Sequence, residues 1–556
     1  MPTDELDGAM PTARPSEPTA ATSARRARVI MVQGTMSNVG KSLLVAGLCR
    51  VLAQDGLRVA PFKSQNMALN SGVTPDGLEM GRAQILQAQA AGVEPDVRMN
   101  PILLKPTSDV GSQVIVCGRS VATMRAGEYF RRKRELIPTI RRCFDELAAT
   151  FDVIVIEGAG SPAEINLKSD DIVNMGLACM VGAPVLLVGD IDPGGVFAQL
   201  YGTLQLLEPQ ERALVRGLVI NKFRGDVDIL RPGLAQLEEL CGVPVLGVLP
   251  HLSLDLDDED SLSPRLAAHP ARRSKAPGAE SASGAPVLDV VVIRLPRLSN
   301  FTDFAPLERH PLVGVRYVDR AADVGRPDLL VLPGTKATLA DLAWLRERGL
   351  DRCVRALAEQ GTPIIGICGG YQMLGEELTD PCGVESPAGE RAEGLGLLPA
   401  ATTFAPQKHL GFTRARVAAA PQPDPGFFPC LADLPLEGYE IHMGETTPLS
   451  SALRPGASSA ATPAGAPCIA LRTSDSRLVG LACGNVLGTY LHGLFDTPAV
   501  VERLVDVLLA RRGLPPADVA VEPAAAIRDR ELDRLAAAIR THLDLPAIYR
   551  ILNEGM

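Results

Sequence analysis

Residues 29–52 have the sequence VIMVQGTMSNVGKSLLVAGLCRVL. An apolar, β-branched run is followed by a short loop between two glycines and then by a stretch whose apolar residues have helical spacing. This order predicts a buried strand, a phosphate-binding loop and a helix whose N-terminus faces the loop. Gly34 and Gly40 bracket five residues, one more than the four of the usual GxxxxGK[ST] pattern. The stretch therefore predicts a nucleotide site of a variant kind within an α/β domain.

The residues of this loop have distinct expected roles. Backbone N–H groups and the helix N-terminus would hold phosphate oxygens, Lys41 would neutralise the transferred phosphate, and Ser42 would bind Mg²⁺. The alternative is an ordinary helix N-terminus with an exposed lysine, but strand, loop and helix in this order favour nucleotide binding. The other loop residues predicted to contact ATP are Gly34, Thr35, Ser37, Asn38 and Gly40.

Three further segments follow predicted strands and contribute candidates to the same site. They are APFKSQNMALNS at 60–71, VIVIEGAGSPAEINL at 153–167 and GLVINKFRGD at 217–226. Because the carboxyl ends of parallel strands meet at one edge of a sheet, side chains from all three can converge on one ligand. Lys63 is a candidate for the γ-phosphate or an acyl phosphate, although an isolated lysine is commonly solvated.

Two carboxylates are candidates for holding magnesium. Glu157 ends a buried strand, where an unpaired carboxylate would be costly to desolvate, so we predict that it is a magnesium ligand. A helix-capping or salt-bridged acid is the alternative. Glu79, in LEMGRAQ, is a further candidate for the metal shell.

A second motif lies in the C-terminal half. The stretch TPIIGICGGYQMLG at 362–375 predicts a buried strand, a sharp glycine-rich turn at Cys368 and a helix, the geometry of a nucleophile elbow with cysteine in place of serine. The helix N-terminus would favour the thiolate, whereas the alternative is a buried structural cysteine. His492, in GTYLHGLFD at 488–496, follows another predicted strand and is the candidate base.

The order of apolar runs and the composition predict the domain organisation. Short β-branched runs alternate with helical stretches, which predicts two parallel-sheet α/β domains. An acidic and then Ser-, Pro- and Ala-rich stretch separates them, and the last part of the chain has helical patterning that we expect to pack on the second domain. The predicted parts are a disordered leader 1–26, an ATP-dependent synthetase 27–254, a linker 255–287, a glutaminase 288–500 and a helical appendage 501–556.

Composition excludes several functional classes. The formal net charge is -10 without a long basic block, so a nucleic-acid partner is not expected. No apolar run approaches the roughly 18 to 20 residues of a membrane span. The chain has 11 cysteines and no CxxC pair, so neither a zinc site nor a disulfide framework is expected. This cysteine usage predicts a protein of the reducing cytoplasm. A homo-oligomer is left open.

These motifs resemble two known families. The loop GTMSNVGKS, with its longer spacing, resembles the P-loop of dethiobiotin synthetase-like amide-forming enzymes. In that superfamily the position of Asn221 recognises the adenine edge, so the resemblance implies this role; a turn asparagine is the alternative. GICGG with GTYLHG resembles class I glutamine amidotransferases, which have a flavodoxin-like fold. That resemblance implies that Cys368 attacks the glutamine amide and that His492 protonates the departing ammonia.

The resemblance to glutaminases also implies an oxyanion site, and the sequence differs from the family pattern at one position. The oxyanion would lie between the N–H of Gly369 and a glycine of LPGTKAT, expected to be Gly334. Ordinary members carry HxE, but Leu494 occupies the acid position, so the group that orients His492 is left open. For His442, in GYEIHMGET, we expect a structural or substrate-side role.

Together the two halves resemble the family of cobyrinic acid a,c-diamide and cobyric acid synthases. The phrases KSQNMALNS, EGAGSPAEINL, GDIDPGGVFAQLYGT, LPGTKAT and EIHMGET are similar to the cobyric acid branch. This resemblance implies ATP-, Mg²⁺- and glutamine-dependent amidation of four peripheral carboxylates (b, d, e and g) of adenosylcobyrinic acid a,c-diamide through acyl phosphates, in cobalamin biosynthesis. Residues 164–168 and 190–203 are candidates for the corrinoid surface.

Three alternatives stay open at this point. An a,c-diamide synthase would add only two amides. A P-loop ATPase switch without synthetase chemistry would have no reason to carry GICGG and GTYLHG. A synthetase with an inactive second domain is the third, because the HxE acid is missing.

Overall fold

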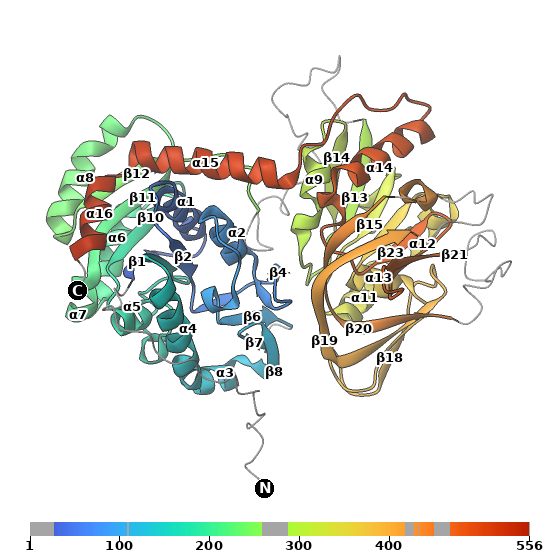
Figure 1. Cartoon of the computed structure of the whole chain (residues 1–556), viewed down its shortest axis with the longest axis horizontal. Helices are drawn as coiled ribbons and strands as arrows, with labels where there is room; N and C mark the ends of the chain where they lie inside the picture. The colour runs from blue at the N-terminus through green and yellow to red at the C-terminus, as the bar shows by residue number, and fades with distance from the viewer. Residues whose placement is uncertain are drawn as a thin grey trace, which may run out of the picture.

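The computed structural model describes residues 27–107, 111–257, 287–417, 427–432, 434–449 and 468–554. The predicted leader 1–26 and most of the predicted linker 255–287 lie outside these residues. The described chain forms two lobes side by side, each built around its own sheet (Figure 1). Within these ranges, no helix combines the length and apolar character needed to cross a bilayer.

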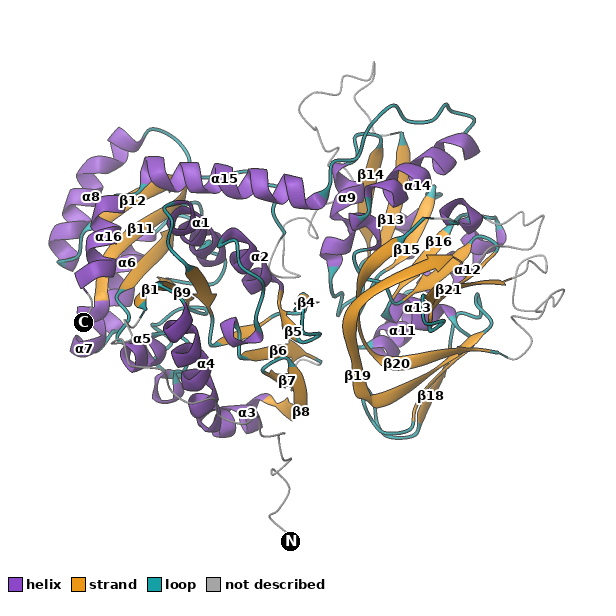
Figure 2. Ribbon diagram, viewed as in Figure 1, coloured by secondary structure: helices purple, strands orange, loops and turns teal. Residues whose placement is uncertain are grey.

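The first lobe is a parallel sheet covered by helices on both faces (Figure 2). Its six strands lie in the order β12-β11-β10-β1-β9-β2, all parallel to their neighbours. Successive side chains of a strand point to opposite faces, so Ile154 and Val155 of β9 belong to two separate apolar clusters. Both faces are therefore buried, which explains the continuous apolar runs in the sequence.

Small strands extend this lobe toward its neighbour. The strands β3, β6, β7 and β8 form a four-stranded sheet, and β4 pairs with β5. The elements of the first lobe are β1 Arg28–Gly34, α1 Lys41–Gln54, β2 Val59–Phe62, β3 Gln65–Met67, β4 Ser71–Val73, β5 Glu79–Gly81, α2 Arg82–Ala90, η1 Val97–Met99, β6 Ile102–Pro106, β7 Gly111–Val116, β8 Arg119–Arg125, α3 Ala126–Arg132, η2 Lys133–Leu136, α4 Ile137–Thr150, β9 Val153–Glu157, η3 Lys168–Asp170, α5 Met175–Val181, β10 Val185–Asp190, α6 Val196–Leu206, α7 Pro209–Leu214, β11 Val215–Phe223, α8 Val227–Cys241 and β12 Val245–Pro250.

The second lobe has a parallel half and an antiparallel half. The parallel strands lie in the order β14-β13-β15-β16-β23, which is the 2-1-3-4-5 order of the flavodoxin fold. The fold class predicted from the sequence is therefore confirmed. The sheet continues through β22, β21 and β19, which pair antiparallel, and the long ribbon of β19 and β20 was not predicted.

The elements of the second lobe and of the C-terminal segment are β13 Leu288–Ile293, η4 Phe301–Phe304, α9 Ala305–Arg309, β14 Val313–Val318, α10 Ala321–Val324, β15 Leu329–Leu332, α11 Thr338–Glu347, α12 Leu350–Glu359, β16 Ile364–Ile367, α13 Gly369–Leu374, β17 Glu377–Asp380, β18 Glu390–Glu393, β19 Ala400–Val417, η5 Phe428–Leu431, β20 Leu436–Pro448, β21 Cys468–Thr473, β22 Leu478–Cys483, β23 Val486–Thr489, η7 Leu494–Asp496, α14 Pro498–Arg511, α15 Ala524–His542 and α16 Leu545–Glu554.

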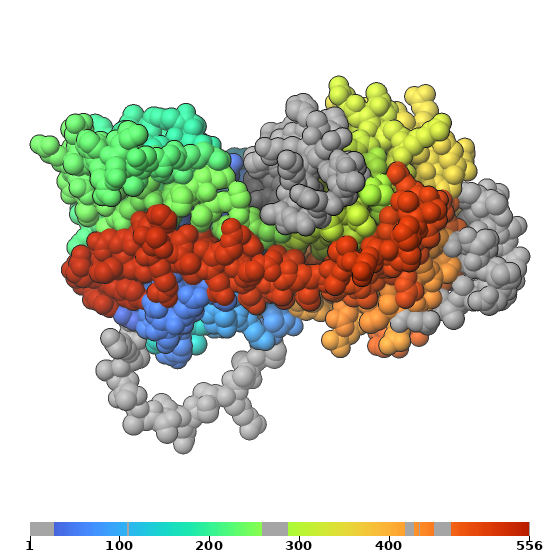
Figure 3. Space-filling view, turned by 90° about the horizontal axis from the view of Figure 1, so that it is seen from above, coloured from blue at the N-terminus to red at the C-terminus, as the bar shows by residue number. Residues whose placement is uncertain are grey.

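The C-terminal helices divide between the two lobes. The apolar face of α14 is buried in the second lobe, but α15 crosses to the first lobe, where Leu535 and Ile539 join the cluster beneath α1. Seen from above, the C-terminal segment forms a band over both lobes (Figure 3). The expectation that this whole segment packs on the second domain is therefore wrong for α15 and α16. Helical spacing predicts an apolar face but not the sheet that it covers.

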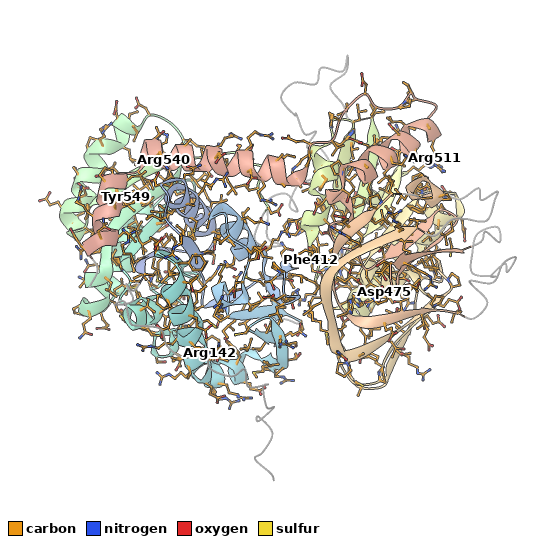
Figure 4. All side chains as sticks on the ribbon, viewed as in Figure 1. Arg142, Phe412, Asp475, Arg511, Arg540 and Tyr549 are labelled. Atoms are coloured by element: carbon orange, nitrogen blue, oxygen red, sulfur yellow. The ribbon has the colours of Figure 1, made fainter. Side chains whose placement is uncertain are left out.

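Side-chain contacts fix α15 and α16 on the first lobe. Arg540 and Tyr549 lie close together there (Figure 4). The Arg540 guanidinium donates to Asp55 Oδ1 at 2.6 Å, and the Tyr549 hydroxyl donates to Asp55 Oδ2 at 2.5 Å. Gly47 of α1 lies so close to Ile539 that an added Cβ would come within 2.2 Å of its side chain. The glycine is therefore required for this helix contact.

Candidate active sites

The phosphate loop follows β1 at the carboxyl edge of the first sheet. Gly40 adopts φ 94° immediately before α1, and an added Cβ would lie 2.3 Å from the Asn221 amide nitrogen, so glycine is needed twice over. Asn38 adopts φ 61°, and Ser37 and Asn38 are exposed at the loop's tip. Thr35 is held at the base, since its N–H donates to the Val188 carbonyl at 2.9 Å. The exposed tip leaves these groups accessible to a ligand.

Lys41 bridges the loop to the segment after β9. Its ammonium donates to the Met36 carbonyl at 2.9 Å and to the Gly160 carbonyl at 3.1 Å. The side chain is buried at 7% exposure and lies next to Gly34, where a Cβ would come within 3.1 Å of Nζ. The lysine charge is thus held inside the loop, as the predicted phosphate contact requires.

Glu157 is the centre of a buried polar cluster. Its Oε1 accepts from Ser42 Oγ and from Lys63 Nζ, each at 2.8 Å. Its Oε2 accepts from the amides of Gln87 at 2.5 Å and Gln84 at 3.2 Å, both on α2. The structure therefore brings together three predicted residues from three separate segments. A hydroxyl and a carboxylate are oxygen donors of the kind that Mg²⁺ prefers, so this pair fits the predicted ion.

Two predicted residues have other contacts. The Asn221 amide donates to the Val39 carbonyl at 2.7 Å, and its Oδ1 accepts from the Lys222 N–H at 2.8 Å. The amide therefore braces the phosphate loop through Val39, and the assignment to the adenine edge stays a prediction. The side chain supports the nucleotide site from behind Gly40.

Glu79 contacts lysines of both lobes. Its Oε1 accepts from Lys105 Nζ and from Ser71 Oγ, at 2.9 and 2.8 Å, and Lys408 of the second lobe binds its other oxygen. Burial disfavours the charged form, but the two lysines outweigh it and lower the pKa of Glu79. Because ammonium groups contact both oxygens, Glu79 forms an ion cluster between the lobes, and its place in the metal shell stays a prediction.

Cys368 lies in a strained turn between β16 and α13. It adopts φ 52° and ψ -109°, and its Sγ lies 3.5 Å from the Ile441 carbonyl. Gly370 packs against the carbonyl of Leu332, where a Cβ would come within 2.0 Å. The glycines therefore permit the tight turn that presents the thiol, as in a nucleophile elbow.

His492 is oriented by a residue that sequence analysis missed. Its Nδ1 lies 2.7 Å from Asp303 Oδ2, and Asp303 Oδ1 also accepts from the Gly493 N–H at 3.0 Å. Leu494, at the usual acid position, is instead buried in the apolar core. Asp303 lies on η4, 189 residues before His492, in a stretch without a motif. Only the fold brings the two side chains together.

The electrostatics of this pair favour the imidazolium. Burial lowers the pKa of His492, but the charge and hydrogen bond of Asp303, aided by Cys368, outweigh burial and raise it to about 10. A protonated imidazole beside a cysteine stabilises the thiolate. Tyr439 stacks on the His492 ring at a centroid distance of 5.4 Å and limits its rotation. The three side chains of Cys368, His492 and Asp303 thus form a cysteine triad.

The predicted oxyanion glycines lie beside this triad. A Cβ on Gly334 would come within 3.0 Å of the His492 ring, and one on Gly369 would come within 2.6 Å of the Thr335 side chain. The Gly334 backbone therefore packs closely against the His492 ring, and the Gly369 backbone packs against Thr335 of the LPGTKAT loop. Their N–H groups stay the predicted oxyanion donors.

His442 belongs to a neighbouring hydrogen-bond network. Its Nδ1 lies 2.6 Å from the Gly444 carbonyl and its Nε2 lies 3.2 Å from Glu440 Oε2. His409 and Glu440 complete a group whose spacing could suit a metal ion. However, Arg477 donates to both oxygens of Glu440, at 2.9 and 2.7 Å. The guanidinium already neutralises the carboxylate, so we interpret this group as structural support behind the triad.

A small cavity beside Cys368 is closed by residues of both lobes. It measures about 30 Å³, and its lining includes Lys105 from the first lobe and Lys336, Glu385 and Lys408 from the second. This volume is close to that of one water molecule. Burial lowers the pKa of Lys408 to about 7 and raises that of Glu385 to about 7. A larger cavity, of about 640 Å³, contacts neither Cys368 nor His492.

Comparisons with known proteins agree with both halves of the chain. A family profile described as the CobQ/CobB/MinD/ParA nucleotide binding domain matches residues 30–260, and one described as a CobB/CobQ-like glutamine amidotransferase domain matches residues 289–500. The chain is 50% identical over 530 residues to cobyric acid synthase of Ruminiclostridium cellulolyticum, covering 95% of this chain and 98% of the relative. It is 49% identical over 534 residues to cobyric acid synthase of Lachnoclostridium phytofermentans, covering 95% and 100%.

PurLQS from Thermotoga maritima aligns at 18% identity and a TM-score of 0.29, covering 40% of this chain and 99% of that chain.

Proposed function

Since the chain belongs to the cobyric acid synthase family, whose members are amide-forming ligases of cobalamin biosynthesis, we propose that it converts four carboxylates of one corrinoid to amides. The substrate is adenosylcobyrinic acid a,c-diamide, and the b, d, e and g side chains gain nitrogen from glutamine with ATP as the energy source. The observation that carries the proposal is the presence on one chain of a phosphate loop with Lys41 and a complete cysteine triad.

The first lobe activates the carboxylate in this proposal. A corrinoid carboxylate oxygen attacks the γ-phosphorus of ATP, the bond to the β-γ bridging oxygen breaks, and ADP leaves with an acyl phosphate remaining. Lys41 and the loop N–H groups hold the transferred phosphoryl group. Ser42 and Glu157 would hold Mg²⁺, which neutralises phosphate charge when bound. Lys63 pairs with Glu157 in the structure. When the phosphates are bound, its ammonium would neutralise part of their negative charge.

The second lobe releases ammonia. The Cys368 thiolate attacks the glutamine side-chain carbonyl, and the N–H groups near Gly369 and Gly334 stabilise the oxyanion. The His492 imidazolium gives its Nε2 proton to the departing ammonia, leaving a thioester. Neutral His492 then takes a proton from water, which hydrolyses the thioester to glutamate and restores the thiolate and imidazolium. The ammonia attacks the acyl phosphate and displaces phosphate.

Exposed apolar side chains support the predicted corrinoid surface. A corrin ring is broad and has apolar faces, so it needs an apolar support on the protein. The carboxyl ends of β10, β1 and β9 are adjacent in the sheet, and the segments after them carry unusually exposed apolar residues. These are Met36, Ile165, Leu167, Phe197 and Tyr201, with exposures between 37% and 63%. They lie on the phosphate loop and on the two stretches predicted for the corrinoid.

Mass spectrometry of the corrinoid product tests the proposal. Adenosylcobyrinic acid a,c-diamide is incubated with enzyme, Mg·ATP and glutamine, and the amides gained are counted against ADP and glutamate formed. Each amidation changes the mass by about -1 Da and consumes one ATP in acyl-phosphate chemistry, so four steps with four ADP are expected. Glutamate release with an unchanged corrinoid would discard the corrinoid assignment and keep the glutaminase.

A further inference from the structure

The segment that carries Asp303 begins with an unusual residue. Asn300 comes directly before η4 and adopts φ 54°, in the left-handed region. Residues with a side chain seldom adopt this region, although asparagine does so more often than most because its amide can hydrogen-bond locally. Asn300 is also buried, at 3% exposure, so its polar groups need partners within the protein.

The first lobe supplies these hydrogen bonds. The Asn300 N–H donates to Asn70 Oδ1 at 2.8 Å, and Asn300 Oδ1 accepts from the Ser71 N–H at 3.1 Å. Asn70 is completely buried. It is fixed within its own lobe, because its carbonyl accepts from the N–H of Arg82, the first residue of α2. Two buried bonds thus join a rigid part of the first lobe to the residue that starts η4.

This contact continues directly into the triad. The Asp303 N–H donates to the Asn300 carbonyl at 3.0 Å, which closes the turn that aims Asp303 at His492. On the other side, the Ser299 N–H donates to the carbonyl of Gly334 at 2.9 Å. The position of Asn300 therefore influences both the carboxylate that orients His492 and the loop that carries a predicted oxyanion donor.

We propose that Asn70 of the synthetase lobe is a positioning residue for the glutaminase triad: by holding Asn300 in its left-handed conformation it places Asp303 against His492. The inference rests on the proposed glutaminase and adds that this activity is complete only when the two lobes are docked. Asn70 reaches the triad through Asn300, whose carbonyl holds the turn of Asp303. It belongs to the stretch KSQNMALNS, which follows β2.

The test compares matched variants in two assays, glutamate release from glutamine and corrinoid amidation with ammonium as the nitrogen source. Asn70→Ala removes the acceptor and is expected to lower glutaminase kcat by about 10- to 100-fold, because misplacement of a catalytic group by about 1 Å can cost that much. The KM for glutamine and the ammonium-dependent rate should stay near the wild-type values. Asn70→Asp keeps an acceptor oxygen for the Asn300 N–H and should recover most of the lost kcat.

A second pair of variants tests the backbone conformation itself. Asn300→Ala and Asn300→Gly both remove the side-chain acceptor, but glycine adopts a positive φ without strain, so Asn300→Gly should retain more activity than Asn300→Ala. Arg309→Ala is the interface control, because it breaks a partly exposed ion pair to Asp255 of 2.7 Å without contacting the triad. It should leave kcat unchanged.

The outcomes separate this inference from the proposed function. Wild-type kcat in Asn70→Ala would overturn the inference, and so would equal losses in Asn70→Ala, Asn70→Asp and Arg309→Ala, which would indicate general loosening of the interface. Loss of the ammonium-dependent rate in Asn70→Ala would place the residue in the synthetase instead. A wild-type enzyme that releases no glutamate would refute the proposed glutaminase, and this inference with it.

Discussion

The nucleotide cluster draws its described contacts from one lobe, whereas the thiol site is completed by the other. Ser42, Lys63 and Glu157 all belong to the first lobe and meet at the edge of its sheet. Cys368 and His492 lie on the second lobe, but Lys105 of the first lobe lines their cavity and Asn70 holds the turn of Asp303. A site contained in one lobe can form before the lobes dock, whereas a site shared between the lobes is complete only after they dock. We therefore expect the release of ammonia from glutamine to depend on how the lobes fit together. Activation of the corrinoid carboxylate by ATP should not depend on it.

The largest expected effect separates the two sites completely. Cys368→Ala removes the nucleophile and should lower glutamine-dependent amidation by about 10⁶-fold, as for other triad nucleophiles. Amidation with ammonium should continue, because activation of the carboxylate takes place in the other lobe. The two rates are measured on the same preparation by counting corrinoid amides. Equal loss with both nitrogen sources would contradict the division of labour.

Lys41→Ala should impair activation of the carboxylate, the step that amidation with glutamine and with ammonium have in common. Loss of the charge that holds the transferred phosphoryl group is expected to lower amidation by about 10³-fold with either glutamine or ammonium. Steady-state ADP formation provides the measurement. Glutamate release in the absence of ATP should be little changed, since Lys41 binds the Met36 and Gly160 carbonyls within the first lobe. Amidation that fails with only one nitrogen source would refute the assignment.

Asp303→Asn should weaken glutaminase by about 10²-fold, at the low end of what acid–base catalysis contributes, and change its pH profile. The charge of Asp303 helps to raise the pKa of His492 to about 10, so the imidazolium persists up to that pH. Without this charge the pKa falls, and the alkaline limb of kcat/KM for glutamine should move to lower pH. Rates measured between pH 6 and 10.5 check the shift against wild type. An alkaline limb at its original pH would mean that Asp303 does not control the imidazole.

Ile539→Ala tests how self-contained the first lobe is. The side chain is fully buried against α1, so its truncation should cost about 2 to 5 kcal/mol in the free energy of unfolding. Denaturant unfolding with and without nucleotide measures this cost. Activity at low temperature should change least of the four variants, because α15 contacts α1 at Gly47 and Asp55, in the middle and at the far end of the helix from Lys41. An unchanged unfolding midpoint would show that α15 is dispensable for the first lobe.

Sequence analysis predicted features encoded in a short stretch better than contacts between residues far apart in the chain. The strand, loop and helix at 29–52 and the turn at Cys368 are each encoded in a short stretch, where glycine spacing and apolar runs suffice. Asp303 could not be found in this way, because no pattern relates it to His492 across 189 residues. Asn221 and Glu79 were predicted to bind ligands, and in the structure both also contact protein groups. A sequence pattern does not reveal such contacts, because an amide or a carboxylate can bind protein groups as well as ligands.

The crossing of α15 also has a consequence for biosynthesis. Val51, on α1, and Arg540, on α15, are in contact although they are 489 residues apart in the chain. At the usual speed of translation, the ribosome needs roughly 25 to 100 s to make the intervening chain. Until then the α1 face of the nascent first lobe lacks its cover, and the apolar residues beneath it stay open to chaperones and to other chains. The lobe that is synthesised first is therefore among the last parts of the protein to finish folding.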